Sequence, residues 1–194
     1  MGAQKKYSNG TRRRGFTLLE LLVSAGVLSL VSVVIAQVVF TTVRLSSRTE
    51  QMKEMKQVGG IVMDSMKRMI QNAKDISYEC DGTPKSQLTI LNVDGGEAVI
   101  SCQFDPVFET FRIASASSTF ATTSYISSAN VALVTSSGAS GCGLANSEDA
   151  ALSFTCFDNT TVQIVFRLRL RNMSTGLFEG VQETFQSTII KRNK

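Results

Sequence analysis

The sequence predicts an α+β fold, in which a long N-terminal helix carries a C-terminal globular head of antiparallel β-sheet packed on the second half of that helix. Three observations predict it. A charge-free apolar run extends from Leu21 to Val43. The residues after it, up to Lys74, have the three- and four-residue apolar spacing of one helix face. After Asp75, stretches rich in Thr, Ser and Val alternate with turn residues, which indicates strands and hairpins.

The positive charge of the chain is concentrated at its N-terminus. The 194 residues carry a net charge of +4, with 20 basic and 16 acidic residues. The basic residues ahead of the apolar run are Lys5, Lys6, Arg12, Arg13 and Arg14, and no acid lies among them. The rest of the chain is therefore nearly neutral, whereas a nucleic-acid-binding domain carries positive charge on its folded body. The basic tip predicts a cytoplasmic N-terminus and a translocated head.

The run from Leu21 to Val43 predicts a membrane-spanning helix. It has about 23 residues, and about 20 suffice to cross the hydrocarbon core of a bilayer. A helix that is apolar all round lies in a large core or in a membrane, and this chain is too short to enclose such a helix itself. We therefore expect residues 1–15 to form a basic leader and residues 16–45 to form a transmembrane helix.

A cleaved secretory signal is the alternative for this region. Its best cleavage site would follow the triplet Val34-Ile35-Ala36. Cleavage there would leave a mature chain that begins inside an apolar segment, which is a poor match.

The start of the apolar helix carries a specific motif. It reads Gly15-Phe16-Thr17-Leu18-Leu19-Glu20-Leu21-Leu22-Val23. This segment resembles the N-terminus of type IV pilins and of the pseudopilins of type II secretion. The resemblance implies that a prepilin peptidase cleaves between Gly15 and Phe16 and methylates Phe16 as the new N-terminal residue. It also implies a structural, non-enzymatic subunit that assembles through its N-terminal helix.

Glu20 is the one acidic residue of the apolar segment. A carboxylate inside a membrane helix is costly, and such residues usually have a partner and a function. The resemblance implies that Glu20 neutralises the terminal amine of a neighbouring subunit during filament assembly. The alternative is that Glu20 lies at the headgroup boundary and has no role.

The helix is expected to continue beyond the membrane through residues 46–76. Its inner face consists of apolar or small residues, which we expect to pack in the core: Met52, Met55, Gly59, Val62, Met66, Met69 and Ala73. The adjacent glycines Gly59 and Gly60 indicate either a bend or a place where a strand approaches closely. Many pilins have a Pro in the membrane half, where the helix melts in filaments. This sequence has Gln37 near that position and Gly26 upstream, so it does not decide whether this helix melts there.

The β-rich head is expected over residues 77–194. The predicted hairpins join 87–93 with 97–104 and 151–157 with 161–170, and further strands are expected at 111–114 and 183–190. Residues 115–141 are expected to be mainly surface loop with one possible strand at 131–135. Residues 172–180 are expected to form a loop. The outward face of strand 161–170, with Arg167 and Arg169, is expected to be solvated.

Four cysteines follow the membrane segment: Cys80, Cys102, Cys142 and Cys156. An even number in a translocated domain predicts two disulfides, although four buried thiols are the alternative. We favour Cys80–Cys102 and Cys142–Cys156 because each closes a short loop, but the sequence does not decide the connectivity. Zinc is not expected, because the chain has no C-x-x-C pair and no His.

The closing strands point to a minor component of the filament. They read TVQIVFRLRLRN and ETFQSTIIKRN. This pair resembles the end of the larger minor pilins and minor pseudopilins. The expected partners are the prepilin peptidase, other pilin or pseudopilin subunits, the inner-membrane assembly platform and the membrane. The head would lie outside the cytoplasm, and later in an extracellular or periplasmic filament.

The sequence offers little support for other chemistry. Without His there is no Ser–His–Asp or Cys–His arrangement, and no cofactor or metal is expected. The pair Glu148-Asp149 supplies too few oxygen ligands for calcium. DNA would be a partner only in a competence pilus, and a solvated strand face is the preferred reading of the arginines. The alternative functions are a signal-anchored extracellular binding module that does not polymerise and a secreted enzyme. The sequence does not identify the pilus or secretion system.

Overall fold

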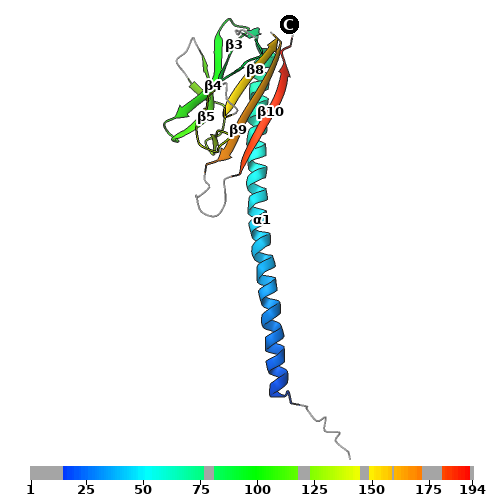
Figure 1. Cartoon of the computed structure of the whole chain (residues 1–194). Coiled ribbons are helices and arrows are strands. Elements are labelled where there is room, and N and C mark those ends of the chain that lie inside the picture. The colour runs from blue at the N-terminus through cyan, green and yellow to red at the C-terminus, as the bar shows by residue number, and fades with distance from the viewer. Residues whose placement is uncertain are drawn as a thin grey trace, which may run out of the picture. The chain divides into compact units, whose positions relative to one another are not determined.

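The computed structural model describes residues 15–76, 81–117, 123–144, 149–158, 160–171 and 181–192. The chain divides into two compact units, residues 1–46 and residues 47–194. The described part of the first unit contains the start of the single long helix. The second unit contains the rest of that helix and every described strand (Figure 1).

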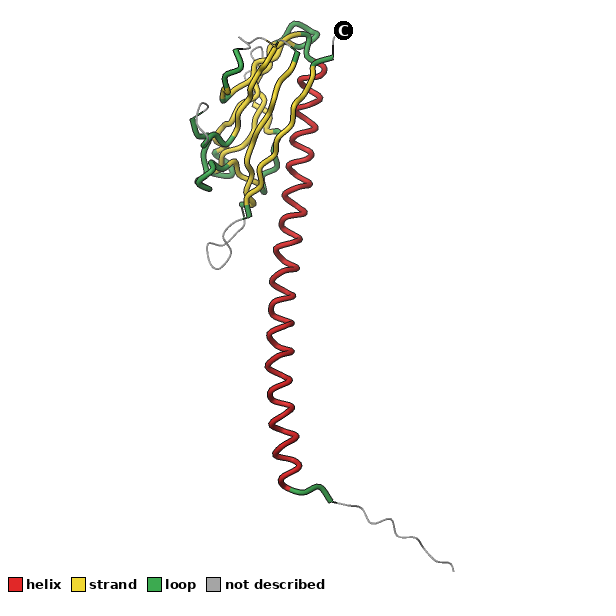
Figure 2. The backbone as a smooth tube through the Cα atoms, turned by 45° about the vertical axis from the view of Figure 1, so that its right-hand side comes forward, coloured by secondary structure: helices red, strands yellow, loops and turns green. Residues whose placement is uncertain are grey.

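The long helix α1 extends from Leu18 to Asn72 and contains 55 residues. The expected range, Phe16 to Lys74, is therefore confirmed to within two residues at each end. No Pro occurs within it, and the pair Gly59-Gly60 does not interrupt it (Figure 2). The chain leaves the helix at Ala73 and enters the first short strand two residues later.

The head contains two antiparallel sheets, which confirms the α+β prediction. The strands of the first sheet, in spatial order, are β1 (Asp75–Ile76), β3 (Gln87–Leu91), β4 (Glu97–Asp105), β5 (Thr110–Ser117) and β6 (Thr123–Tyr125). Those of the second are β10 (Gln182–Ile190), β9 (Thr161–Leu170), β8 (Leu152–Asp158) and β2 (Pro84–Lys85), with β7 (Val131–Leu133) also paired to β9. All described pairings are antiparallel.

Both predicted hairpins are present. The β3–β4 hairpin turns at Asp94-Gly95-Gly96, where Gly95 has a φ of +85° that favours glycine. In the β8–β9 hairpin, the Asp158 carboxylate accepts hydrogen bonds from the backbone N–H and the hydroxyl of Thr160, at 2.8 and 2.7 Å. Such bonds from a short acidic side chain close a turn locally.

The expectation of a mainly surface loop over residues 115–141 is wrong in its first part, whereas the strand considered at 131–135 is confirmed as β7. β5 continues to Ser117, and β6 occupies 123–125. The segment Val131–Val134 is fully or almost fully buried, with β7 hydrogen-bonded to β9. A short run that is apolar at every position has no period-two pattern, because both of its faces are covered. Residues 118–122 lie outside the described part of the chain.

One core joins the second half of α1 to both sheets. The predicted inner face of the helix is confirmed, since Met55, Val62 and Met66 are buried and Met52 and Met69 pack against the core at its margin. The fully buried Ile70 was not part of the predicted face. The sheets contribute buried residues from alternating positions of their strands: Leu88, Ile90, Ile100, Ile113, Phe154, Ile164, Phe166 and Leu168.

Gly59 is where the helix and the second sheet approach most closely. A Cβ atom built at Gly59 would lie 2.0 Å from Cζ of Phe185 on β10, far inside van der Waals contact. The Phe185 ring is stacked on Phe166 of β9, with 5.1 Å between ring centroids. Of the two interpretations of the glycine pair, close approach is therefore the correct one. Gly60 has open space in the same test.

The two adjacent glycines give a matched test of this contact. We expect Gly59→Ala to destabilise the head by about 1–3 kcal/mol, because the Phe185 ring must shift. Gly60→Ala should stabilise the helix by up to about 1 kcal/mol. Thermal unfolding of the purified chain in detergent, followed by circular dichroism, would measure both. Equal effects of the two substitutions would contradict the contact, and Phe185→Leu should relieve the Gly59→Ala defect.

The disulfide connectivity differs from the one favoured by the sequence. Cys102 of β4 is bonded to Cys142, with a Cα–Cα distance of 5.6 Å and a sequence separation of 40. The shortest-loop argument failed because the segment after β7 folds back toward the first sheet, so distant cysteines become neighbours. Cys156 of β8 is also disulfide-bonded, and Cys80 lies outside the described residues.

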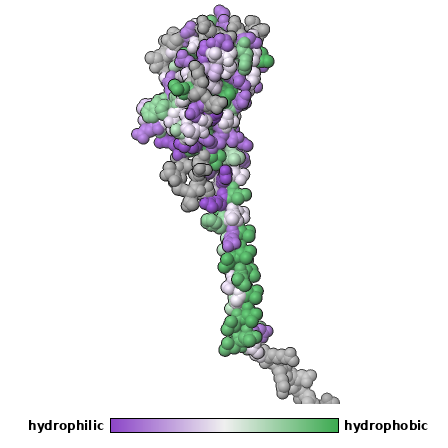
Figure 3. Space-filling view, in the orientation of Figure 1, coloured by the Kyte–Doolittle hydropathy of each residue, from purple (hydrophilic) through white to green (hydrophobic). Residues whose placement is uncertain are grey.

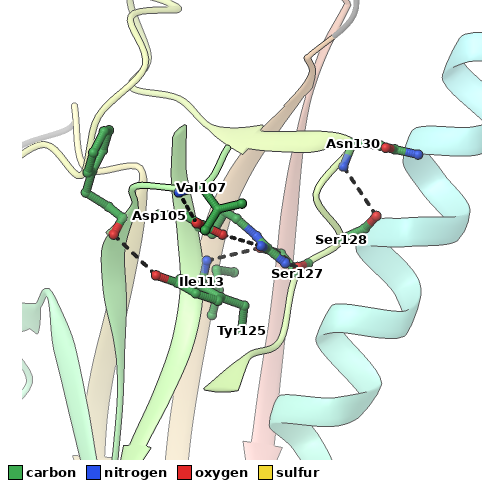
Figure 4. A network of polar contacts seen from close by, with 9 residues as sticks. Asp105, Val107, Ile113, Tyr125, Ser127, Ser128 and Asn130 are labelled. Carbon is green, nitrogen blue, oxygen red and sulfur yellow. Dashed lines mark hydrogen bonds and ion pairs between the residues drawn. The ribbon is translucent and has the colours of Figure 1, made fainter. Parts of the chain in front are cut away.

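A buried ion pair stabilises the far end of the first sheet (Figure 4). The guanidinium of Arg112 donates to the Asp105 carboxylate and to the Ser127 carbonyl, and it lies 4.5 Å from the centroid of the Tyr125 ring. The Asp105 carboxylate also accepts from the backbone N–H of Val107 at 3.0 Å. Burial alone would raise the pKa of Asp105, but the hydrogen bonds from Arg112 and from the backbone outweigh it and leave the pKa below its usual value.

This network predicts a specific acid sensitivity. Because the folded-state pKa of Asp105 is lowered, its contribution is present above the unfolded-state value of about 3.9 and is lost as the pH falls through the folded-state pKa. Asp105→Asn should therefore be much less stable than the wild type at pH 7 and approach it in stability below about pH 4. Urea unfolding across pH 3–7 would test this, with Asp64→Asn on the exposed face of α1 as the control. A stability difference that stays constant with pH would refute it.

Candidate processing and assembly site at the start of the helix

The start of α1 is fixed by a local cap. The backbone N–H of Glu20 donates to the Thr17 hydroxyl oxygen at 3.3 Å, and the N–H of Leu21 donates to the Thr17 carbonyl at 3.2 Å. Thr17 is thus the N-cap and Glu20 the third helical residue, the spacing of a capping box. This cap was not predicted, although the T-x-x-E spacing of Thr17 and Glu20 in the sequence is its signal.

The Gly15-Phe16 bond lies just outside this cap. Residues 15–17 have no helical structure, and the Phe16 side chain is 73% exposed. A Cβ atom placed on Gly15 would meet no atom within 4 Å. The bond is therefore in a non-helical, open segment directly ahead of a rigid helix, where a peptidase can reach it. Arg12, Arg13 and Arg14 lie outside the described residues.

The Glu20 carboxylate is exposed in the first turn of α1. Negative charge is favourable there because the first N–H groups of a helix point outward. Within the part of the chain that the structure describes, no side chain pairs with this carboxylate.

The hydroxyl groups of the apolar helix are satisfied within the helix itself. Each of five hydroxyls donates to a backbone carbonyl three or four residues earlier, and these belong to Ser24, Ser29, Ser32, Thr41 and Thr42. They present no unpaired donor to hydrocarbon. Glu20 and Gln37 are then the strongly polar side chains between Phe16 and Val43.

The surface of this part of α1 is apolar on all sides. Its large hydrophobic side chains are exposed from Leu18 to Leu45, and Figure 3 shows green atoms along this part of the helix, interrupted by white ones. In the described chain, α1 is the one helix long and apolar enough to cross a membrane. The structure thus confirms, by length and composition, the membrane-capable helix predicted from the sequence.

Residues 10–36 match the family model of the prokaryotic N-terminal methylation motif. The match supports a type IV pilin-like prepilin. It includes Gly15, Phe16 and Glu20, the three residues singled out by the sequence. No curated protein and no solved structure matches the chain.

The other candidate residues of the head have structural surroundings. Arg167 and Arg169 are half-buried, and their guanidinium groups donate to the carbonyls of Ala150 and Gly138 at 3.0 and 2.8 Å. The expectation of a solvated basic face on β9 is therefore wrong for these two residues. Asp149 accepts a hydrogen bond from the Ser136 hydroxyl, and Glu148 lies outside the described residues. Among the described side chains, no group of three His, Cys, Asp or Glu residues could hold a metal.

Proposed function

We propose that this chain is a structural subunit of a type IV pilus or a related pseudopilus, processed by a prepilin peptidase between Gly15 and Phe16. One observation carries the proposal. An open, non-helical Gly-Phe bond lies immediately before a capped apolar helix, within the matched methylation motif. The peptidase would then methylate the new amine of Phe16.

Processing at this bond leaves the helix intact. Thr17 stays in place as the N-cap, so cleavage removes only the leader and creates an amine on Phe16, four residues before Glu20. When apolar helices pack together, this amine and the Glu20 carboxylate both leave water. Pairing the amine of one subunit with Glu20 of the next compensates the cost of burying either charge and selects one register.

We further propose that the chain is a minor component that primes or caps the filament. The support is the resemblance of the closing strands, now seen as β9 and β10, to the larger minor pilins. Before assembly the subunit would be a single-pass membrane protein with a cytoplasmic N-terminus. Its partners would be the peptidase, neighbouring subunits and an inner-membrane assembly platform.

Processing is tested by Gly15→Val in cells that contain a prepilin peptidase. Because no atom lies near the Gly15 Cβ position, the substitution leaves the fold unchanged, and a defect must reflect recognition of the bond. We expect the wild type to begin at a methylated Phe16 and the variant to retain its leader, as measured by intact mass and N-terminal sequencing. Gly26→Ala, also in open space, is the matched control.

Two results would contradict the processing proposal. A mature wild-type chain that keeps Met1 would indicate a signal-anchored binding module. A chain that begins after Ala36 would indicate a cleaved secretory signal.

Assembly is tested by Glu20→Gln, because Gln keeps the capping-box residue type while removing the charge. An amine left buried without its partner costs on the order of 3–5 kcal/mol, so incorporation into filaments should fall by a hundredfold or more. Membrane insertion and processing should persist. Incorporation is measured as the fraction of the chain in sheared, pelleted filaments.

The control for Glu20→Gln is Thr17→Ala, which removes the cap and keeps the carboxylate. Loss of a cap costs about 1 kcal/mol, so its effect on incorporation should be small. If Glu20→Gln assembles as well as the wild type, or if Thr17→Ala is equally defective, the charge of Glu20 is not the assembly contact.

A further inference from the structure

The second unit has a polar pocket beside the first turns of its part of α1. These turns come directly after the apolar run in the sequence. The pocket has a volume of about 510 Å³, and its wall combines the first turns of α1 in that unit, the 135–139 turn and the start of β10. Its polar lining residues are Arg48, Arg169, Gln182 and Ser137. Among the described residues that line it there is no acidic side chain, and these residues contribute two positive charges and neutral hydrogen-bonding groups.

Arg169 is held in place at the wall of this pocket. One guanidinium nitrogen donates to the Gly138 carbonyl at 2.8 Å, and a guanidinium has five N–H donors. The carbonyl is presented by a tight turn, in which Gly138 has a φ of +81° and its N–H donates to Thr135 at 2.9 Å. The half-buried guanidinium is thus oriented by backbone, with donors left for a ligand.

Arg48 approaches the pocket from the helix. It is one turn before Met52, on the same face of α1 as Met52 and Met55, so it continues the core-facing stripe with a charge in place of an apolar residue. Its side chain is exposed, and it donates no hydrogen bond within the described residues. A cation at this position does not contribute to the packing of the core.

The position of Arg48 in the sequence indicates which kind of anion would lie near the pocket. Arg48 follows the last residue of the apolar run, Val43, by five residues, which is about 7.5 Å along a helix. The polar layer of a bilayer extends about 5–7 Å beyond the hydrocarbon core on each side. When the apolar run spans the membrane, the Arg48 backbone is therefore at the outer edge of the polar layer, and its long side chain can reach back to the lipid phosphates.

We propose that this pocket binds the phosphate group of a membrane phospholipid in the membrane-anchored subunit, through Arg48 and Arg169. Two guanidinium groups match a phosphate, because each can donate two parallel hydrogen bonds to its oxygens. Gln182 and Ser137 supply further polar contacts. The inference depends on the membrane-anchored state of the proposed function and not on cleavage or polymerisation.

The test uses the full, uncleaved chain in a non-ionic detergent, analysed by native mass spectrometry with added phosphatidylglycerol. We expect one retained phospholipid per chain and at least tenfold weaker retention by Arg48→Gln, since a hydrogen bond to a charged group contributes about that factor. Arg169→Lys should also weaken retention. Arg68→Gln, the same change of charge on an exposed position five turns further along α1, should have no effect.

Four outcomes would overturn the proposal. The first is equal retention by the wild type and Arg48→Gln, which would place the lipid elsewhere. The second is equal retention of a phosphate-free glucosyl diacylglycerol. The third is binding of inorganic phosphate as tight as that of the lipid, which would make the pocket a free-anion site. The fourth is unchanged lipid retention with impaired filament incorporation by Arg48→Gln, which would assign the pocket to an acidic group of a neighbouring subunit.

Because the lipid-retention measurements use the uncleaved chain, they are independent of the processing test. A chain that retains lipid through Arg48 but is never cleaved would contradict the proposed function and support the pocket assignment. A chain that is cleaved after Gly15 and shows no Arg48-dependent lipid would do the reverse.

Discussion

The structure depends on one constraint: α1 has to bury two kinds of surface along a single helix. From Leu21 to Val43 the helix has no charged residue and exposes apolar side chains on all sides, and nothing in the described chain covers it. From Met52 onward it has one apolar stripe, which the two sheets bury. Apolar surface of the first kind is stable only in lipid or against other apolar helices, because water penalises it by roughly 25 cal/mol per Å². The N-terminal half therefore requires a partner environment, while the C-terminal half does not.

The head uses different means to hold its parts together. Against α1 the second sheet packs closely. The Phe185 ring lies over Gly59, where any larger side chain would collide with it. In the first sheet, which contributes no residue at the Gly59 contact, the chain also has the Cys102–Cys142 bond and the buried pair of Asp105 and Arg112. The bond joins β4 to the segment after β7, and the ion pair joins β4 to β5. The head therefore combines close packing against the helix with covalent and ionic links.

The sequence predicted those features that are governed by local periodicity. The helix, its buried methionines and both hairpins follow from spacing and turn residues, which depend on short stretches of chain. The prediction failed where the outcome depends on long-range contacts. Cys142 meets Cys102 across 40 residues, and the unpredicted strand β6 forms by pairing with β5. The capping role of Thr17 was readable and was overlooked, because Glu20 already had an explanation from the family resemblance.

Glu20 is informative because two physical roles coincide in it. As the third residue of a capped helix, its negative charge is favourable even in an isolated chain, so the carboxylate does not make the unassembled subunit unstable. In the proposed filament the same carboxylate is costly where apolar surfaces exclude water around it, and a neighbouring amine offsets part of that cost. On this proposal the unassembled helix is stable in the membrane with its charged tip near the boundary, and it gains most from a neighbour in one register. A carboxylate that is favourable at the start of an isolated helix, but needs a partner inside a filament, would thus distinguish the unassembled subunit from the assembled one.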